Sequence, residues 1–168
     1  MTDHKRASQE SLNALEQLGE PLDLTNVDYT MVCEELVKRK KQFAGDRKQK
    51  LLSSNQLDGC NKARAMKIMS SLMTYYHSQQ SSLGAFVSCQ MIKMSLDFGH
   101  CEDSVFGAGM FAANLVTILE DFDEGTAWAH STLSLMERYN KNTVIPFIYG
   151  ALYGMVLVWK GENRKFIL

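Results

Sequence analysis

Cysteine and histidine are the residues of this sequence whose chemistry could support metal binding or nucleophilic catalysis. Zinc sites use such ligands in pairs at short fixed spacings, for example C-x-x-C or H-x-x-x-H. Here only His100 and Cys101 are adjacent, while Cys89 and His130 lie far from them in the sequence. We therefore expect no bound metal and no cofactor. A thiol enzyme that uses Cys89 or Cys101 is an alternative hypothesis, which an unusually reactive thiol would support.

Other catalytic motifs are not found in the sequence. It contains no G-x-S-x-G, no G-x-x-x-x-G-K-[ST] and no G-x-G-x-x-G, so neither a serine nucleophile nor a phosphate-binding loop is predicted. The acidic stretch from Glu120 to Glu124 lacks the spacing of a calcium loop, and we interpret it as a turn between helices. No catalytic residue is therefore predicted, and the chain is expected not to be an enzyme.

Seven of the eighteen basic residues lie between positions 38 and 50. Such a stretch is typical of a nuclear-import signal or of a patch for nucleic acid or anionic lipid. It also suits the carboxyl end of a helix, where positive charge interacts favourably with the helix dipole. Phe43 is the only aromatic residue among them, and the net charge of the chain is −1. We therefore favour a solvated helix end and predict no nucleic-acid partner.

Composition and periodicity predict an all-α globular protein. Apolar residues make up 45% of the chain and only two prolines are present, and apolar residues recur at helical spacing without alternation of the strand type. Polar residues 1–6 are not followed by an apolar run, so we expect a cytoplasmic protein with reduced thiols. About seven helices are predicted, at residues 8–18, 28–43, 63–76, 83–98, 104–119, 125–139 and 143–159.

An internal repeat appears when the sequence is aligned with itself at a shift of forty-one residues. Cys89 then falls on His130 and Phe98 on Tyr139, and in the next segment Gly109 falls on Gly150. A period of this size is typical of helical hairpins that stack into a solenoid. The predicted fold is an irregular solenoid of helical hairpins of the tetratricopeptide-like kind. We divide it into leading helices at 1–60, a helical-repeat region at 61–160 and a tail at 161–168, or into one continuous domain at 8–160.

Two uncharged runs, Ser104–Leu119 and Thr143–Trp159, support a different hypothesis. The second run is seventeen residues long and contains Gly150-x-x-x-Gly154, a pattern that allows close helix contact in membranes. The alternative function is therefore a small integral membrane protein with helices at 104–119 and 143–159. Small residues at these spacings also let soluble helices pack closely, and Asn114 interrupts the first run. We favour buried helices over membrane insertion.

Four stretches of the sequence carry a resemblance to a known family: Leu15–Leu22, Met94–Gly99, Asp121–Ala129 and Leu135–Asn140. They resemble the helical region of large multidomain signalling proteins, in which a protein-kinase-like module and an AAA-type ATPase precede the helices and sensor and histidine-kinase modules often follow. The stretch Asp121–Ala129 is in addition similar to the turn and helix start of a degenerate tetratricopeptide unit. The resemblance covers Ser11 to Lys160 in order. It carries no catalytic residue over, because the nucleotide-binding and kinase motifs of that family lie outside the helical region.

This resemblance implies a non-enzymatic interaction and signal-relay module, like the arm that couples an ATPase module to sensor or kinase output. Its partner would be another protein or a neighbouring domain of a larger signalling protein, bound in a groove between paired helices. Because the chain ends just after the last predicted helix, we expect a fragment, a stand-alone remnant or an end covered by a partner. The residues chosen for the interaction, as exposed side chains near the turns and the sixth helix, are Asp121, Asp123, Glu124, Trp128, His130 and Arg138.

Overall fold

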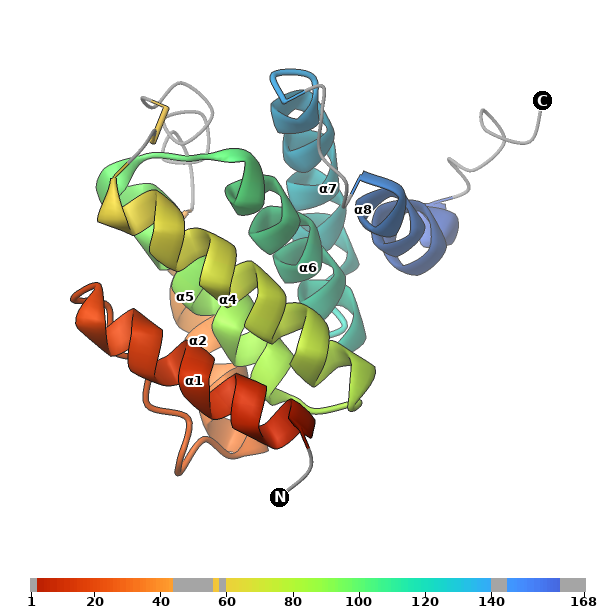
Figure 1. The fold of residues 1–168 in the computed structure, drawn as a ribbon. Helices are drawn as coiled ribbons and strands as arrows, with labels where there is room; N and C mark the ends of the chain where they lie inside the picture. Colours follow the sequence, from red (N-terminus) through yellow and green to blue (C-terminus); the bar gives the residue numbers. More distant parts are fainter. Residues whose placement is uncertain (1–2, 44–55, 58–59, 140–144, 161–168) are drawn as a thin grey trace.

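A computed structural model describes residues 3–43, 56–57, 60–139 and 145–160. The described residues contain seven helical segments and no strand, as the sequence predicts. The last segment, α8, continues as a π-helical turn, η1, and a 3-10 turn, η2 (Figure 1). The sequence further predicts a turn at 47–54, helix stops at Gly45 and Gly161 and a helix cap at 142 or 143; these positions and the tail lie outside the described residues. The segments are α1 (Asp3–Gln17), α2 (Tyr29–Gln42), α4 (Asn61–Ser78), α5 (Leu83–Phe98), α6 (Glu102–Thr117), α7 (Phe122–Met136), α8 (Ile145–Ala151), η1 (Leu152–Val156) and η2 (Leu157–Lys160).

Several helices begin and end where local chemistry places the boundary. The Asp28 side chain accepts a hydrogen bond from the Met31 amide at 2.8 Å and caps the start of α2. Gly99, at a φ of 100°, ends α5 at the predicted residue, since a side chain is strained in that conformation. The prediction for α7 was three residues late at both ends. Asp121 caps this helix, so Glu120 and Asp121 lie in the connection after α6, whereas Asp123 and Glu124 lie in the first turn of α7.

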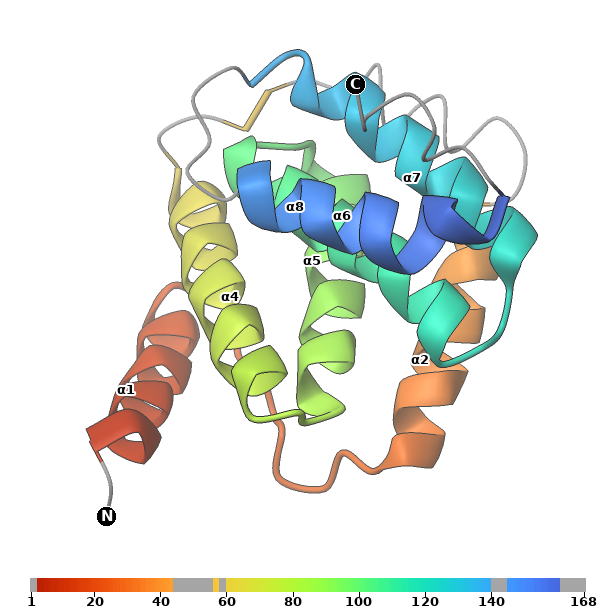
Figure 2. The ribbon, with the colours of Figure 1, turned by 90° about the vertical axis from the view of Figure 1, so that its right-hand side faces the viewer.

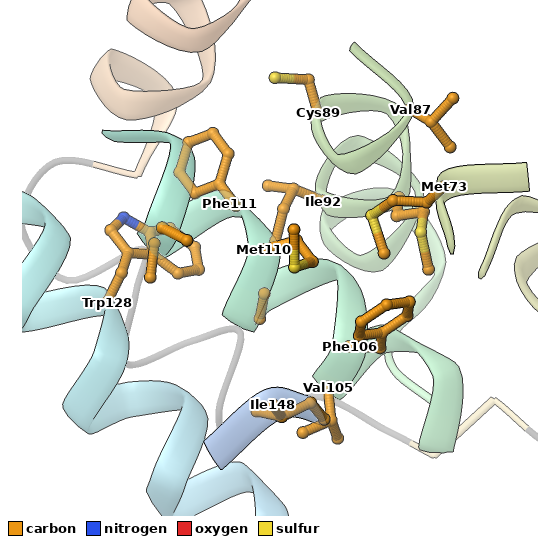
Figure 3. Close-up of a cluster of buried hydrophobic side chains, with 14 of the residues drawn as sticks. Met73, Val87, Cys89, Ile92, Val105, Phe106, Met110, Phe111, Trp128 and Ile148 are labelled. Atoms are coloured by element: carbon orange, nitrogen blue, oxygen red, sulfur yellow. The ribbon is translucent and has the colours of Figure 1, made fainter. Parts of the chain in front are cut away.

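The centre of the molecule is α6, which contacts α2, α4, α5, α7, α8 and η1. Every residue of α6 from Ser104 to Ala113 is buried. The Phe111 ring of this helix and the Trp128 ring meet edge to face at a centroid distance of 5.0 Å, and Trp128 in turn contacts Phe43, just after the end of α2, at 4.8 Å. Figure 3 shows this cluster, with side chains of α6 reaching toward α5 and α7. The run that the membrane hypothesis inserts into a bilayer is therefore the core helix of the fold.

Neighbouring helices pair along the chain, and some of the contacts skip a helix. α4 packs on α5, α5 on α6 and α6 on α7, while α4 also contacts α6 and α6 also contacts α8. α1 packs on α4 and α2 packs on α5 (Figure 1). Helices α5 and α7 begin at residues 83 and 122, and α6 and α8 at 102 and 145, so the spacings are 39 and 43 residues. Among the described helices, none combines the length and the apolar character that crossing a bilayer requires.

The close contact of α6 with α7 depends on Gly125. A Cβ atom at this position would lie 2.5 Å from Cγ2 of Val116 and 3.1 Å from the backbone oxygen of Ala112. Gly125→Ala should therefore lower the free energy of unfolding by about 1–3 kcal/mol, because the two helices must move apart. Urea denaturation followed by circular dichroism measures this change.

Gly150→Ala is the matched control. A Cβ at Gly150 meets no atom within 4 Å, so this change should leave stability unchanged or raise it by up to about 1 kcal/mol through helix propensity. Equal stability of Gly125→Ala and the natural chain would contradict the close approach of α6 and α7.

Candidate functional site

Asp121 links α2 to α7 and is not a free surface carboxylate. Its side chain accepts a hydrogen bond from the Glu124 amide at 3.2 Å and forms an ion pair with Lys40 of α2. The hydrogen bond from Lys40 is the main reason why the pKa of this carboxyl lies below its usual value. Asp123 is exposed beside it and Glu124 is half-buried, both in the first turn of α7. We call residues 120–124 the acidic turn. One of its carboxylates, that of Asp121, holds α7 on α2, while the carboxylate of Asp123 is exposed to solvent.

The other three predicted interaction residues do not join the acidic turn in one site. Trp128 is 1% exposed and lies in the core between Phe43 and Phe111, so its choice as an exposed residue was wrong. A tryptophan at this helix position offers the largest apolar area available for burial against α6. His130 is exposed halfway along α7, and Arg138 is exposed just beyond its end. Arg138 lies about 20 Å along the helix axis from the acidic turn, at 1.5 Å per residue.

Several cations of the basic stretch at 38–50 form ion pairs within the fold. Arg39 is 4% exposed, forms an ion pair with Glu35 and donates a hydrogen bond to Gln42 at 2.6 Å. Lys38 also lies 3.4 Å from a carboxylate oxygen of Glu35, and Lys40 is paired with Asp121. Within residues 38–41, three of the four cations therefore pair with described carboxylates. Arg47, Lys48 and Lys50 lie outside the described residues.

The two cysteines that carried the thiol-enzyme hypothesis are buried. Cys89 is 0% exposed, and burial, together with the negative charge of Glu35, raises the pKa of its thiol to about 12. Burial also raises the pKa of the Cys101 thiol. Because the thiolate is the reactive form, neither group is suited to nucleophilic attack at neutral pH. In the part of the chain that the structure describes, no group of three or more His, Cys, Asp or Glu side chains is placed to hold a metal ion.

His100 is buried between α5 and α6 as an uncharged ring. It is 2% exposed, and neither ring nitrogen has a hydrogen-bond partner in the structure. Its backbone oxygen accepts bonds from the Leu57 amide at 2.8 Å and the Tyr139 hydroxyl at 3.1 Å, and the Tyr139 ring stands edge-on to the imidazole. Burial, and secondly the positive charge of Arg138, lower the pKa of the imidazole. His100 therefore packs the α5–α6 connection as an apolar ring.

A hollow of about 630 Å³ lies along α2. The described residues that line it include one partly buried thiol, that of Cys33, but no histidine that could activate it. Its other described lining residues offer an aliphatic side chain and charges of both signs. The described lining residues therefore do not pair a nucleophile with a histidine base. The described lining residues are Cys33, Glu34, Val37, Lys38, Lys41 and Gln42.

The surface that the sequence did not reveal lies on the last helical segment. No residue from Ile145 to Trp159 is charged, and the segment was predicted to be buried. Only one side of it is buried, against α6 and α7. Figure 2 shows α8 and the turns that follow lying across α6 with their other side turned to the viewer. The buried residues are Ile148, Ala151, Leu152, Val156 and Leu157.

We name the other side the C-terminal face. Its midline consists of four residues at intervals of four, and a Cβ at either glycine would meet no atom within 4 Å. Tyr149 and Tyr153 flank the midline with stacked rings 5.8 Å apart. Phe147, Met155 and Trp159 project from the opposite edge of the same face, as helical geometry places them. The midline residues are Pro146, Gly150, Gly154 and Val158.

The π-helical turn η1 keeps this face continuous. In an unbroken α-helix the residues after Leu152 would lie on progressively different sides of the axis. The wider turn over Leu152–Val156 adds one residue, so Val156 and Leu157 return to the buried side and Val158 returns to the midline. Turns of this kind occur frequently at functional sites.

The two ends of the C-terminal face differ in their polar neighbours. At one end the Trp159 ring contacts Phe122, the residue between Asp121 and Asp123, at a centroid distance of 5.8 Å. The exposed rings at this end therefore lie beside the acidic turn. At the other end the Phe147 ring contacts His77, in the last turn of α4, at 5.6 Å.

The chemistry available on this face is that of docking. Aromatic and aliphatic side chains can bury area against another apolar surface, and the midline glycines allow a backbone to come close. Comparisons of the chain with protein-family models, with curated proteins and with solved structures found no match. Its function is therefore inferred from its own surfaces.

The burial of the thiols makes a simple test of the thiol-enzyme hypothesis. Cys33 and Cys60 are partly exposed, whereas Cys89 and Cys101 are buried. With an aromatic disulfide reagent at pH 8, two thiols of the native protein should react first and the other two only in denaturant. The double variant Cys33→Ser/Cys60→Ser should show no fast phase. A fast phase in that variant would revive a reactive Cys89 or Cys101.

The lowered pKa of His100 predicts a loss of stability in mild acid. The unfolded chain takes up a proton near pH 6.5, whereas the folded protein resists it until a lower pH. The free energy of unfolding should therefore fall as the pH drops below about 6.5, by up to about 1.4 kcal/mol per pH unit from this group. Stability measured in urea between pH 5 and pH 7.5 should show a smaller loss for His100→Gln than for the natural chain. Parallel curves would contradict the prediction.

Proposed function

We propose that this chain is a non-enzymatic helical interaction and signal-relay module that binds a protein partner through its C-terminal face. The observation that carries the proposal is the uncharged, aromatic and exposed side of the segment from Ile145 to Trp159. The module would act like a helical arm that couples an ATPase module to sensor or kinase output in the cytoplasm. In this proposal, binding of the partner at the C-terminal face changes the position or activity of a neighbouring domain.

The size of the apolar surface supports this role. Five large apolar side chains of the C-terminal face, and the adjoining Phe122 as a sixth, keep 37–67% of their surface exposed. Aromatic side chains each bury 150–250 Å² when covered, so the exposed part of the six amounts to about 500 Å². A patch larger than a few hundred Å² on a soluble protein usually marks a binding site. The six are Phe122, Phe147, Tyr149, Met155, Val158 and Trp159.

Helix contacts support a tetratricopeptide-like stack as the scaffold of this module. In stacked hairpins, the first helix of one pair contacts the first helix of the next pair as well as its own partner. The contacts of α4 with α6 and of α6 with α8 follow this order, with α4–α5 and α6–α7 as the pairs. The C-terminal face then lies at the end of the stack, where a further helix would continue it.

The acidic turn gives the proposed interface a polar edge. Asp123 is exposed in the first turn of α7, next to the Phe122 ring that touches Trp159. Binding sites commonly combine an apolar centre with a charged rim that sets orientation. Asp123 and Glu124 are thus proposed to lie at the rim of the interface. Trp128 contributes only indirectly, because it packs α7 on α6.

Photo-crosslinking in cells tests the proposal. A benzophenone amino acid in place of Tyr149 should give a discrete covalent adduct with the bound protein, and a second change, Val158→Asp, should remove it by placing a charge on the midline. The matched control replaces Tyr29, which is 58% exposed at the start of α2, and should not give this adduct. No adduct at position 149, or the same adducts at both positions, would contradict the proposed face.

A further inference from the structure

The C-terminal face has features that suit contact with itself. It carries no charge, so two copies can meet without bringing like charges together at its centre. Its midline is narrow at Gly150 and Gly154, and it is bordered by larger side chains on both edges. We infer that a second copy of this chain occupies the face, with the two C-terminal helices crossing antiparallel at the glycines. This inference rests on the proposed function, because it names the partner.

The exposed area is sufficient for a dimer of modest affinity. The six large apolar side chains offer about 500 Å² on each copy, and specific interfaces bury from about 600 to 1,000 Å² per partner. The exposed surface of Pro146, Tyr153 and the two midline glycines adds to this area, which brings it to the lower end of the range. Association is therefore expected in the micromolar range of concentration and not as an obligate dimer.

An antiparallel twofold arrangement gives every part of the face a suitable partner. A twofold axis that crosses the helices midway between Gly150 and Gly154 places each glycine opposite the other glycine of the second copy. The same axis keeps each edge of the face against its own counterpart. Tyr149 then lies opposite Tyr153 of the second copy, and Phe147 lies opposite the Met155–Trp159 end, which pairs an aromatic ring with a thioether and an indole.

Charge decides between antiparallel and parallel crossing. The acidic turn lies beside Trp159 at one end of the face, and His77 lies beside Phe147 at the other. In a parallel dimer the two acidic turns would lie at the same end of the interface, on opposite edges, and like charges near one another oppose association. Antiparallel crossing separates the acidic turns and brings each one toward His77 of the other copy. The polar surroundings of the face therefore favour the antiparallel arrangement.

The glycines allow this crossing at short range. Helix axes usually lie 8–10 Å apart, at a distance set by the side chains between them. With glycine at two successive midline positions, the backbones can approach at the lower end of that range, and the bordering rings can then reach the other helix. The open space above both glycines leaves this approach unobstructed by described residues.

Sedimentation equilibrium of the full chain tests the dimer. The mass should rise from 19.0 kDa toward twice that value as the concentration increases through the micromolar range. Val158→Asp should raise the dissociation constant by at least about 100-fold, because each copy would bury an unpaired carboxylate. The matched control is Met31→Asp on α2, since Met31 and Val158 are both 41% exposed. It should dimerise like the natural chain.

Disulfide formation tests the direction. In a chain with Cys33→Ser and Cys60→Ser, the variants Gly150→Cys and Gly154→Cys should crosslink when mixed but not when each is oxidised alone, because only the mixed pair brings the Cα atoms within reach. Crosslinking of each variant with itself would overturn the antiparallel arrangement.

Failure of the dimer and failure of the proposed function give different results. A chain that stays monomeric at several hundred micromolar overturns the second copy as partner. If position 149 then still forms a photo-adduct with a different protein, the interaction face stands with another occupant. A monomer that forms no adduct overturns both. Dimerisation that Val158→Asp leaves unchanged would place the interface elsewhere.

Discussion

The burial of α6 on all sides is the constraint on which the rest of this structure depends. A helix surrounded by five other helices must keep small residues where neighbours come closest and large ones where space remains. Gly107 and Gly109 stand at close approaches to Met91 and Ile148, while Phe111 fills the space beside Trp128. The cover over α6 is completed by α8 and η1. One side of the C-terminal segment is thereby fixed, and its other side is left to solvent.

The helices and many of their ends could be predicted because the signals are local. Asp28 as a cap and Gly99 as a stop each act within one turn of their own helix, so neither needs knowledge of the rest of the fold. The start of α7 was placed late because Asp121 and Gly125 are both plausible at a helix start. Gly125 is in fact required for contact with Val116, which is a tertiary demand that no local pattern contains.

The candidate site could be predicted much less well, because exposure depends on neighbours. The sequence offered charged residues as the surface, yet Asp121 and Lys40 pair with each other and Arg39 is buried with Glu35. The uncharged run at 143–159 was predicted to be a buried helix. Because the run has no polar side, its sequence pattern does not show which side of the helix stays exposed to solvent. Gly150-x-x-x-Gly154 was the one available signal for contact with another helix. Its meaning becomes clear only when both glycines are seen to face outward.

The exposed side of the C-terminal segment is costly for the isolated chain. Each glycine inside a helix lowers its stability by about 1 kcal/mol relative to alanine, and a π-helical turn is rarely maintained without a reason. The exposed part of large rings such as Trp159 contributes no burial free energy until it is covered. These features raise neither the folding stability nor the solubility of a monomer. They are all explained if association covers the face, because the apolar area then buried offsets the weakness of the helix and couples its order to binding.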